Sequence, residues 1–255
     1  MQVVQIVFSP TGGTQRVADI IAGALGKPAE RVDLTSPTAG FSSVHLDEED
    51  LVVIAVPSYG GRVPALAAER LAQVRGHGAR AVLVCVYGNR AYEDTLVELE
   101  DVASAAGFHE VAAVAAVAEH SILHQYATGR PDSADRAELE GFARRIAEKL
   151  AGQNADAAPT GVPGNRPYKQ AGGSAMVPKG DSSCVACGLC ARRCPAQAID
   201  PASPRKTDPE RCIGCMRCVS ECPQGARKVS GALLKAAGLA LRKACSERKG
   251  CELYL

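Results

Sequence analysis

The chain has 255 residues, of which 46% are hydrophobic, and its formal net charge is +1. This length allows one large domain or two modest ones, and the near-neutral charge argues against a protein that binds nucleic acid or a membrane surface through a basic face. No run of about 18 apolar residues occurs, so we expect no membrane span. The chain opens on a strand-like segment and shows no cleavable leader, which is typical of a cytoplasmic protein.

Apolar segments alternate with helix-like segments through the first 150 residues. We expect strands at Val3–Phe8, Arg31–Leu34, Leu51–Val56, Ala81–Val86 and Val111–Ala118. We expect helices at Gln15–Leu25, Ala65–Arg75, Tyr92–Ala106 and Ala134–Leu150, with Ser36–Glu49 as the weakest helix candidate. Unalternated apolar runs are typical of strands buried on both faces. Their alternation with helices predicts a parallel sheet covered by helices on both sides.

The turn after the first predicted strand, residues 9–14, reads Ser-Pro-Thr-Gly-Gly-Thr. Hydroxyl groups and glycine amides gathered at a helix N-terminus are typical of a phosphate site. The turn lacks the lysine of a P-loop and the glycine spacing of a dinucleotide fold. An ordinary capped turn, with Thr11 or Thr14 as the N-cap, is the alternative. The candidate phosphate-binding residues are Ser9, Thr11, Gly12, Gly13 and Thr14.

Two more loops, residues 57–64 and 87–94, follow the third and fourth predicted strands. Ligands of open parallel sheets bind beyond the carboxyl ends of the strands. Three of the six tyrosines fall in these loops, which a flat aromatic ligand stacked on tyrosine would explain; amphipathic side chains at loop edges are the alternative. The candidate binding residues here are Pro57, Ser58, Tyr59, Gly60, Gly61, Tyr87, Gly88, Asn89 and Tyr92.

Eight cysteines near the C-terminus repeat one spacing at an interval of 28 residues, and each run ends in Cys-Pro. This is the bacterial spacing for two [4Fe–4S] clusters, in which the fourth cysteine of each run ligates the other cluster. Structural zinc sites use paired ligands and do not fit the pattern. The sequence therefore predicts one cluster on Cys184, Cys187, Cys190 and Cys222, and a second on Cys194, Cys212, Cys215 and Cys218.

The segments on either side of the cysteine runs are predicted to be a linker and a C-terminal helix. Residues 152–178 are rich in Gly, Pro, Ala and Ser, which is typical of a mobile connector, although we expect part of it to be ordered. Leucines at helical spacing predict a helix over Gly231–Lys249. Cys85 is expected in the core, and Cys245 and Cys251 as free thiols. Cysteines clustered as metal ligands fit a reducing compartment.

Two resemblances follow from these motifs. Residues 1–151 resemble a flavodoxin domain: the turn at 9–14 is similar to its FMN phosphate loop, and the loops at 57–64 and 87–94 are similar to those that hold the isoalloxazine ring. Residues 179–230 resemble the bacterial two-cluster ferredoxin domain. The whole chain resembles the family of flavodoxin–ferredoxin fusion proteins, including the stretch Gly164–Tyr168 of the linker at 152–178.

The resemblance implies an α/β fold with a flavodoxin-like doubly wound five-stranded parallel sheet of order 2-1-3-4-5, followed by a small α+β ferredoxin-like domain and, over 231–255, a C-terminal helix and tail. It also implies FMN and two [4Fe–4S] clusters as cofactors. Arg62 and Arg90 either stabilise the reduced flavin or are solvated loop charges. His120 and His124 either face the flavin edge as proton donors or have no role beyond the loop.

The expected function is intracellular electron transfer, in which an iron–sulfur flavoprotein passes electrons between FMN, two [4Fe–4S] clusters and an external redox protein. Two alternatives stay open. One is a flavin-dependent oxidoreductase acting on NAD(P)H, a quinone or another small molecule. The other is a non-catalytic redox sensor or assembly partner. No nucleic-acid partner is expected, because basic residues are not interleaved with aromatic ones.

Overall fold

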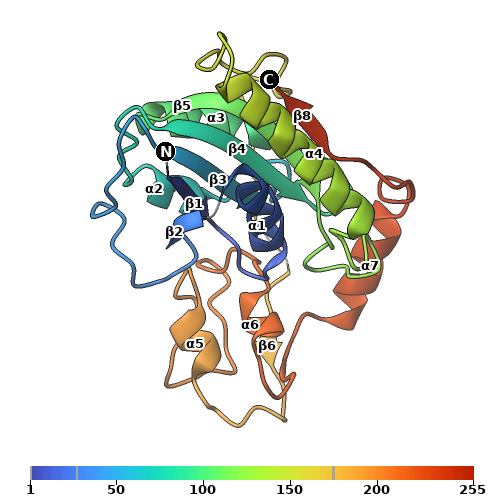
Figure 1. Ribbon diagram of the computed structural model, residues 1–255. Coiled ribbons are helices and arrows are strands. Elements are labelled where there is room, and N and C mark those ends of the chain that lie inside the picture. Colours follow the sequence, from blue (N-terminus) through green and yellow to red (C-terminus); the bar gives the residue numbers. More distant parts are fainter. Residues whose placement is uncertain (1, 27, 174–175) are drawn as a thin grey trace.

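The computed structural model describes residues 2–26, 28–173 and 176–255. Its larger part is an α/β domain around a central sheet, and a smaller cysteine-bearing lobe lies below the sheet in the view of Figure 1. The strands of the sheet are β1 (Val3–Val7), β2 (Pro28–Asp33), β3 (Leu51–Pro57), β4 (Arg80–Tyr87), β5 (His109–Val117) and β8 (Glu252–Tyr254). The helices that flank it are α1 (Gly13–Leu25), α2 (Ala65–Leu71), α3 (Thr95–Ala105) and α4 (Ser133–Leu150).

The strand order is β2-β1-β3-β4-β5-β8. The first five strands are parallel, in the predicted order 2-1-3-4-5, and Ile6, Ile54 and Leu83 lie in register across β1, β3 and β4. The sixth strand comes from the C-terminal tail and pairs antiparallel with β5, placing Leu253 opposite Val114. The sequence does not predict this strand, because three residues are too few for a periodic signal.

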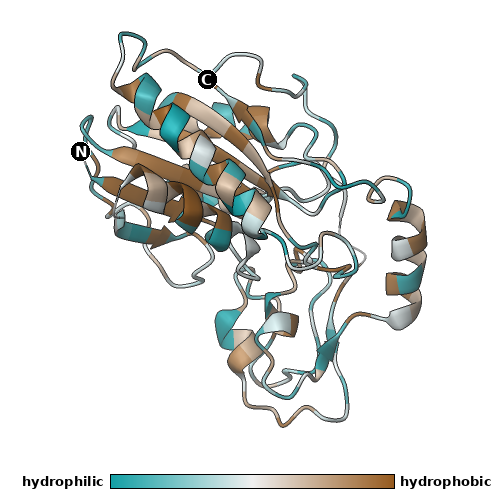
Figure 2. Ribbon diagram, turned by 45° about the vertical axis from the view of Figure 1, so that its right-hand side comes forward, coloured by the Kyte–Doolittle hydropathy of each residue, from teal (hydrophilic) through white to brown (hydrophobic). Residues whose placement is uncertain are grey.

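Two hydrophobic cores lie on opposite faces of the sheet. Alternate residues of each strand point to opposite faces, so one face packs on α2 and α3 and the other on α1 and α4. Leu83 belongs to the first core and Val84, its neighbour, to the second. Figure 2 shows the strands as the most continuously hydrophobic part of the molecule, enclosed between helices with polar outer faces. This arrangement is the predicted doubly wound α/β fold.

Several helices are shorter than the sequence pattern suggested. The structure has no helix over Ser36–Glu49, where Pro37 lacks an amide donor and Phe41 and Leu46 are buried individually in the core. α3 begins at Thr95, three residues late, because Glu93 has a left-handed backbone (φ 43°). The C-terminal helix α7 (Gly231–Leu241) ends eight residues early, and the chain then returns to the α/β domain.

The lobe is built from short elements around the cysteines: β6 (Lys179–Gly180), α5 (Leu189–Arg193), α6 (Arg217–Ser220) and β7 (Arg227–Lys228). β6 and β7 form a two-stranded antiparallel sheet. Its core is one small cluster made of Ala191, Cys194, Ala198, Ile199 and Cys218. The lobe is thus a separate small domain beside the α/β domain.

Part of the linker is fixed against the α/β domain. Asp94 Oδ1 accepts from both the backbone N and Nδ2 of Asn165 (2.9 Å each), and its Oδ2 accepts from the Lys169 backbone N (2.7 Å). Arg166 forms ion pairs with Glu100 and Asp101 on α3. The linker therefore crosses α3 as an ordered strap over residues 164–169. In the described parts of the chain, no helix has the length and apolar character needed to cross a bilayer.

Candidate cofactor-binding sites

The loop after β1 leads directly into α1. Gly12 is the N-cap residue in a left-handed conformation (φ 88°), and it offers no side chain to cap the helix. Ser9 Oγ accepts from the Gln15 amide (2.9 Å), which is the third amide of the helix. Among the described residues, no side chain accepts from the first two amides, those of Gly13 and Thr14. The loop thus presents free helix N-terminal amides beside hydroxyl groups, which suits an anion.

The loop after β3 makes a tight turn in which the Tyr59 and Arg62 backbones hydrogen bond to each other (3.0 and 3.2 Å). Gly60 and Gly61 have left-handed backbones, and a Cβ on Gly61 would collide with Glu93. Ser58 Oγ lies 2.7 Å from Thr95 Oγ1, so its hydroxyl is engaged with the start of α3. The turn leaves Tyr59 partly buried at the edge of the α/β domain.

The loop after β4 is held by the C-terminal segment. Asn89 Nδ2 donates to the carbonyl oxygens of Cys245 (3.1 Å) and Glu247 (2.8 Å), while its Oδ1 accepts from the Lys249 backbone N (3.1 Å). Tyr92 OH donates to Glu252 Oε2 (2.6 Å). The structure therefore turns the Asn89 and Tyr92 side chains toward the tail rather than toward the other two loops.

The remaining polar candidates near these loops also have protein partners. Arg62 forms a two-point ion pair with Glu98, with Nε–Oε2 at 2.7 Å and Nη2–Oε1 at 2.8 Å. Arg90 pairs with Glu93 at 2.9 Å. These contacts mean that both arginines are neutralised locally instead of being free loop charges.

The two histidines after β5 differ in their environment. A Cβ on Gly88 would lie 2.8 Å from the His120 ring, so His120 packs directly against the loop after β4. Burial lowers the pKa of His120, and its Nδ1 accepts from the Ile122 and Leu123 amides (3.2 Å each). His124 is exposed and bonds Glu119. Of the two, only His120 therefore lies against a candidate loop as a neutral imidazole.

In the lobe, the cysteines gather in two groups that mix the two runs. Four of them line one cavity; this outer set comprises Cys184, Cys187, Cys190 and Cys222. The other four lie close enough for their charges to interact; this inner set comprises Cys194, Cys212, Cys215 and Cys218. Each set takes three cysteines from one run and the fourth from the other. This exchange is the arrangement expected of two-cluster proteins.

The backbone repeats along with the cysteines. Ala186 and Gly214 have left-handed φ values of 55° and 64°, and Gly188 and Met216 of 72° and 62°. The Ala198 amide donates to Cys194 Sγ at 3.3 Å, and the Ala226 amide donates to Cys222 Sγ at 3.3 Å. Both halves therefore wrap their cysteines in the same way. Amide donors to sulfur are one of the levers that tune iron–sulfur clusters.

The thiol environments are suited to a bound metal. Burial, together with the smaller effect of the other inner-set sulfurs, raises the pKa of Cys215 to about 12. Burial also raises the pKa of Cys218 to about 11, with Arg227 opposing the shift. At neutral pH these thiols keep their protons unless a cation stabilises the thiolates. A group of four cysteine sulfurs gathered in this way fits an iron–sulfur cluster.

The inner set lies next to the α/β domain. Burial raises the pKa of Tyr59 well above its ordinary value, and the nearby Cys215 sulfur adds to the shift. Ile213, between Cys212 and Cys215, packs against the hydrophobic core on the face of the sheet that α2 and α3 cover. Arg70 on α2 links the two parts, because its Nη1 donates to the Leu34 carbonyl (2.6 Å) and its Nη2 to the Pro195 carbonyl (2.8 Å). The inner set therefore lies against the α/β domain, within electrostatic range of Tyr59.

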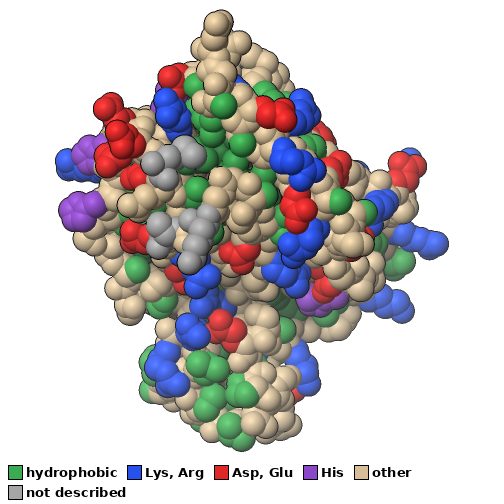
Figure 3. Space-filling model, viewed as in Figure 1, with side chains coloured by type: hydrophobic (Ala, Val, Ile, Leu, Met, Phe, Trp, Pro, Cys, Tyr) green, Lys and Arg blue, Asp and Glu red, His purple; other side chains and the backbone are tan. Residues whose placement is uncertain are grey.

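The outer set faces the surface. Cys187 is exposed, and Val185, between two outer-set cysteines, is 64% exposed. Figure 3 shows hydrophobic side chains gathered toward the end of the lower lobe, with Lys and Arg on its flanks. The two sets are thus at different depths, one against the α/β domain and one toward solvent.

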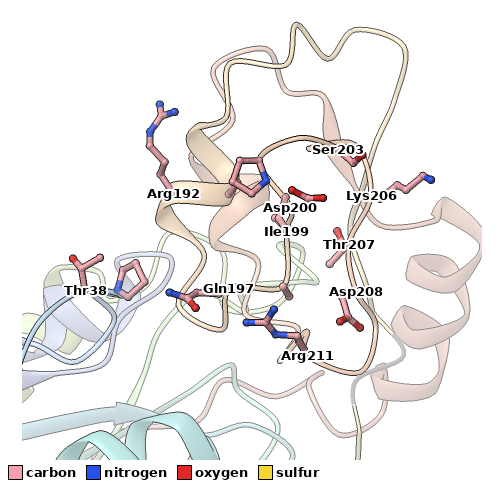
Figure 4. A pocket seen from close by; sticks show the side chains of 14 residues that line it. Thr38, Arg192, Gln197, Ile199, Asp200, Ser203, Lys206, Thr207, Asp208 and Arg211 are labelled. Carbon is pink, nitrogen blue, oxygen red and sulfur yellow. The ribbon is translucent and has the colours of Figure 1, made fainter.

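A groove separates the lobe from the loop that carries Pro37 and Thr38 (Figure 4). Side chains of both charges line it, including Arg192 and Arg211 together with Asp200 and Asp208. Its lining contains neither a cysteine nor a residue of the loops after β1, β3 and β4. The groove is therefore separate from the candidate cofactor sites, and its mixed charge favours no one class of partner.

Comparison with known proteins agrees with this division. The 4Fe-4S binding domain family matches residues 178–200 and again residues 205–228. Each match contains one cysteine run. The lobe is a ferredoxin-type 4Fe-4S domain. Among curated proteins, no sequence matches the chain.

Several solved structures are similar to the α/β domain. A flavodoxin from Streptococcus pneumoniae TIGR4 is 24% identical, covers 58% of this chain and 99% of its own, and has a TM-score of 0.42. Flavodoxin 1 from Bacillus cereus is 16% identical, with coverages of 59% and 99% and a TM-score of 0.40. A NAD(P)H:quinone oxidoreductase from Methanothermobacter marburgensis is 15% identical, with coverages of 60% and 98% and a TM-score of 0.31.

The likenesses are distant, and the flavodoxin-like assignment comes from the strand order of the sheet itself. Together with the 4Fe-4S match, this order fits a flavodoxin–ferredoxin fusion. Sequence reasoning did not identify Arg70 and Arg227, two buried arginines that bond backbone carbonyls of the lobe. A single arginine carries no motif, although Arg227 could have been noticed by aligning the two cysteine runs.

Proposed function

We propose that the chain is an electron-transfer protein that holds FMN in its α/β domain and two [4Fe–4S] clusters in its lobe, and that it exchanges electrons with an external redox partner. FMN exchanges one or two electrons and each cluster exchanges one, so a protein that holds both can convert between paired and single electrons. The observation that carries the proposal is the packing of the inner cysteine set against the α/β domain, where Ile213, between Cys212 and Cys215, packs on the hydrophobic core and Arg70 bonds the Pro195 carbonyl next to Cys194.

The α/β domain supplies a place for the flavin. A sheet of this order binds FMN at the switch point between its first and third strands. The amides of Gly13 and Thr14 at the start of α1, with the hydroxyl groups of Thr11 and Thr14, would hold its phosphate. The turn from Tyr59 to Gly61 would lie beside the ring. Asn89 and Tyr92, which bond the tail, would contribute through the shape of their loop rather than through their side chains.

The lobe then orders the route of the electrons. The inner set lies against the α/β domain, and the outer set opens to solvent at Cys187. A redox partner that docks at the end of the lobe would approach the outer set first. The residues therefore support a linear route in which flavin site, inner set, outer set and partner follow one another. The groove of Figure 4 lies away from the flavin loops, so it does not favour a small-molecule substrate at the flavin.

The test is anaerobic purification, followed by counting of iron and flavin and a redox titration observed by absorbance and EPR. We expect about eight irons and one FMN per chain, and electrons that equilibrate between flavin and clusters. Thr11→Asp places a negative charge in the phosphate loop and should weaken FMN binding by about tenfold or more without loss of iron. Thr38→Asp, in an exposed loop, is the control. Fully loaded protein whose flavin and clusters fail to equilibrate would refute the proposal.

A further inference from the structure

The two halves of the lobe differ at one buried position. The repeat of 28 residues places Ile199 of the first half opposite Arg227 of the second. Both side chains are buried, with 4% and 1% of their surface exposed. Arg227 is the largest fully buried side chain in the described parts of the chain. A guanidinium thus occupies the place where the matching half of the domain has an aliphatic side chain.

This guanidinium has hydrogen-bond partners but no counter-charge. Nη1 donates to the Pro204 carbonyl (2.6 Å), and Nη2 donates to the Pro178 carbonyl (2.8 Å) and to the Thr207 hydroxyl. Its Nε is buried without a partner. Among the described residues, Arg227 pairs with no carboxylate. Burying a positive charge without a partner is costly, so a negative group is expected nearby.

The groups that can supply that negative charge are the cysteine sulfurs of the two sets. Arg227 lines the cavity of the outer set. It shares that lining with Cys190 and Cys222, and it also lies within electrostatic range of Cys212 and Cys218 in the inner set. Four thiolates around a cluster core of charge 2+ leave about −2, and one added electron makes about −3. The missing counter-charge of Arg227 is therefore supplied by loaded clusters.

We infer that Arg227 is a positioning residue that holds one fixed positive charge between the two cluster sites and stabilises the clusters in their reduced, more negative state. The inference rests on the cluster loading in the proposed function. Each reduction adds one electron, supplied by dithionite in the test below, to one cluster. The positive charge raises the reduction potential of both clusters, so that donors of higher potential can reduce them. The same carbonyl bonds hold the segments at 178 and 204 in place.

The test compares Arg227→Ile, Arg227→Gln and Arg227→Lys in the full chain, with Lys228→Gln as the matched control. Arg227→Ile gives the second half the residue that the first half has at the matching position, Ile199. Lys228 is the next residue of β7, but it is exposed and pairs with Asp181 at 2.7 Å. Iron is counted first, and the two cluster potentials are then measured by EPR during an anaerobic dithionite titration. These readouts need no electron flow through the flavin.

We expect Arg227→Ile and Arg227→Gln to lower the equilibrium constant for reduction of one or both clusters by about tenfold or more. For a one-electron couple, each factor of ten lowers the reduction potential by about 59 mV. Arg227→Lys should stay within about threefold of the parent, as should Lys228→Gln. Unchanged potentials in an iron-replete neutral variant would overturn the inference.

Folding failures are also decisive. If both neutral variants lose iron while Arg227→Lys keeps it, the requirement is for positive charge and the inference stands. If all three lose iron, Arg227 acts through its carbonyl bonds alone and the inference fails. Clusters that never exchange electrons with the flavin would refute the proposed function and leave this inference intact.

Discussion

In the α/β domain, two extensive sets of buried side chains cover both faces of the sheet, whereas the lobe has a single core cluster of five residues, two of them cysteines. Burial of apolar surface is the main driving force of folding, and a domain of about 50 residues rarely buries enough of it alone. The α/β domain can therefore fold by hydrophobic burial, whereas we expect the lobe to depend on its cofactors.

The largest effect is expected from removing one cluster ligand. Cys215→Ser should reduce the iron content from about eight to about four per chain and increase hydrogen exchange through residues 179–230, because a ligand set with one weak member no longer holds its cluster. The α/β domain should keep its protected amides. Iron analysis and hydrogen exchange measured by mass spectrometry check both parts.

Cys245→Ser is the matched control for this experiment. Cys245 is also buried, but it lies in the C-terminal segment and belongs to neither cysteine set. It should retain all the iron. An iron-replete Cys215→Ser chain, or equal iron loss in the two variants, would contradict the division of the lobe into an inner and an outer set.

A truncated side chain in the core of the α/β domain should destabilise that domain and leave the clusters of the lobe unaffected. Leu83 lies at the centre of β4 with none of its surface exposed, in register with Ile54 and Ala113. Leu83→Ala should lower the free energy of unfolding of the α/β domain by about 2–5 kcal/mol, from lost burial and the cavity that remains. The absorbance of the clusters in the native protein should not change.

Urea unfolding followed by circular dichroism measures this loss. Leu233→Ala on α7 is the control, since Leu233 is 42% exposed and should cost no more than about 0.5 kcal/mol. If Leu83→Ala instead removed iron from the lobe, the two domains would be one cooperative unit, and the comparison drawn above would be wrong.

The same contrast explains what the sequence could predict. The sheet and its order were predictable because buried parallel strands are long apolar runs, as in β3 and β4. The cysteine sets were predictable because cluster ligation fixes a spacing in the chain. β8, the strap at 164–169 and the roles of Asn89 and Tyr92 were not, because each depends on pairing between segments far apart in the sequence. Gly164 is an example: a Cβ at this position would collide with Val97 on α3, which lies far away in the sequence.

The smallest effect is expected at the strap, where a single carboxylate of the α/β domain holds the chain that leads to the lobe. Three N–H donors, two from Asn165 and one from Lys169, bond Asp94. Asp94→Ala removes these acceptors and should cost about 1–3 kcal/mol of local stability. The measurement is hydrogen exchange at residues 164–169, with Asp156→Asn, at an exposed surface ion pair of the same linker, as the control.

The strap should also respond to acid in a defined direction. The backbone N–H of Lys169 and the N–H groups of Asn165 lower the pKa of Asp94 below its ordinary value of 3.8, against the effect of burial. A group whose pKa is lowered by folding contributes its full stability above that ordinary value and loses it as the pH falls through the lowered pKa. Protection of the strap should therefore be constant down to about pH 4 and decrease below it. In Asp94→Asn the decrease should be absent, because the amide does not titrate. An equal acid response in both proteins would mean that other carboxylates, such as Asp101 beside Arg166, hold the strap in place of Asp94.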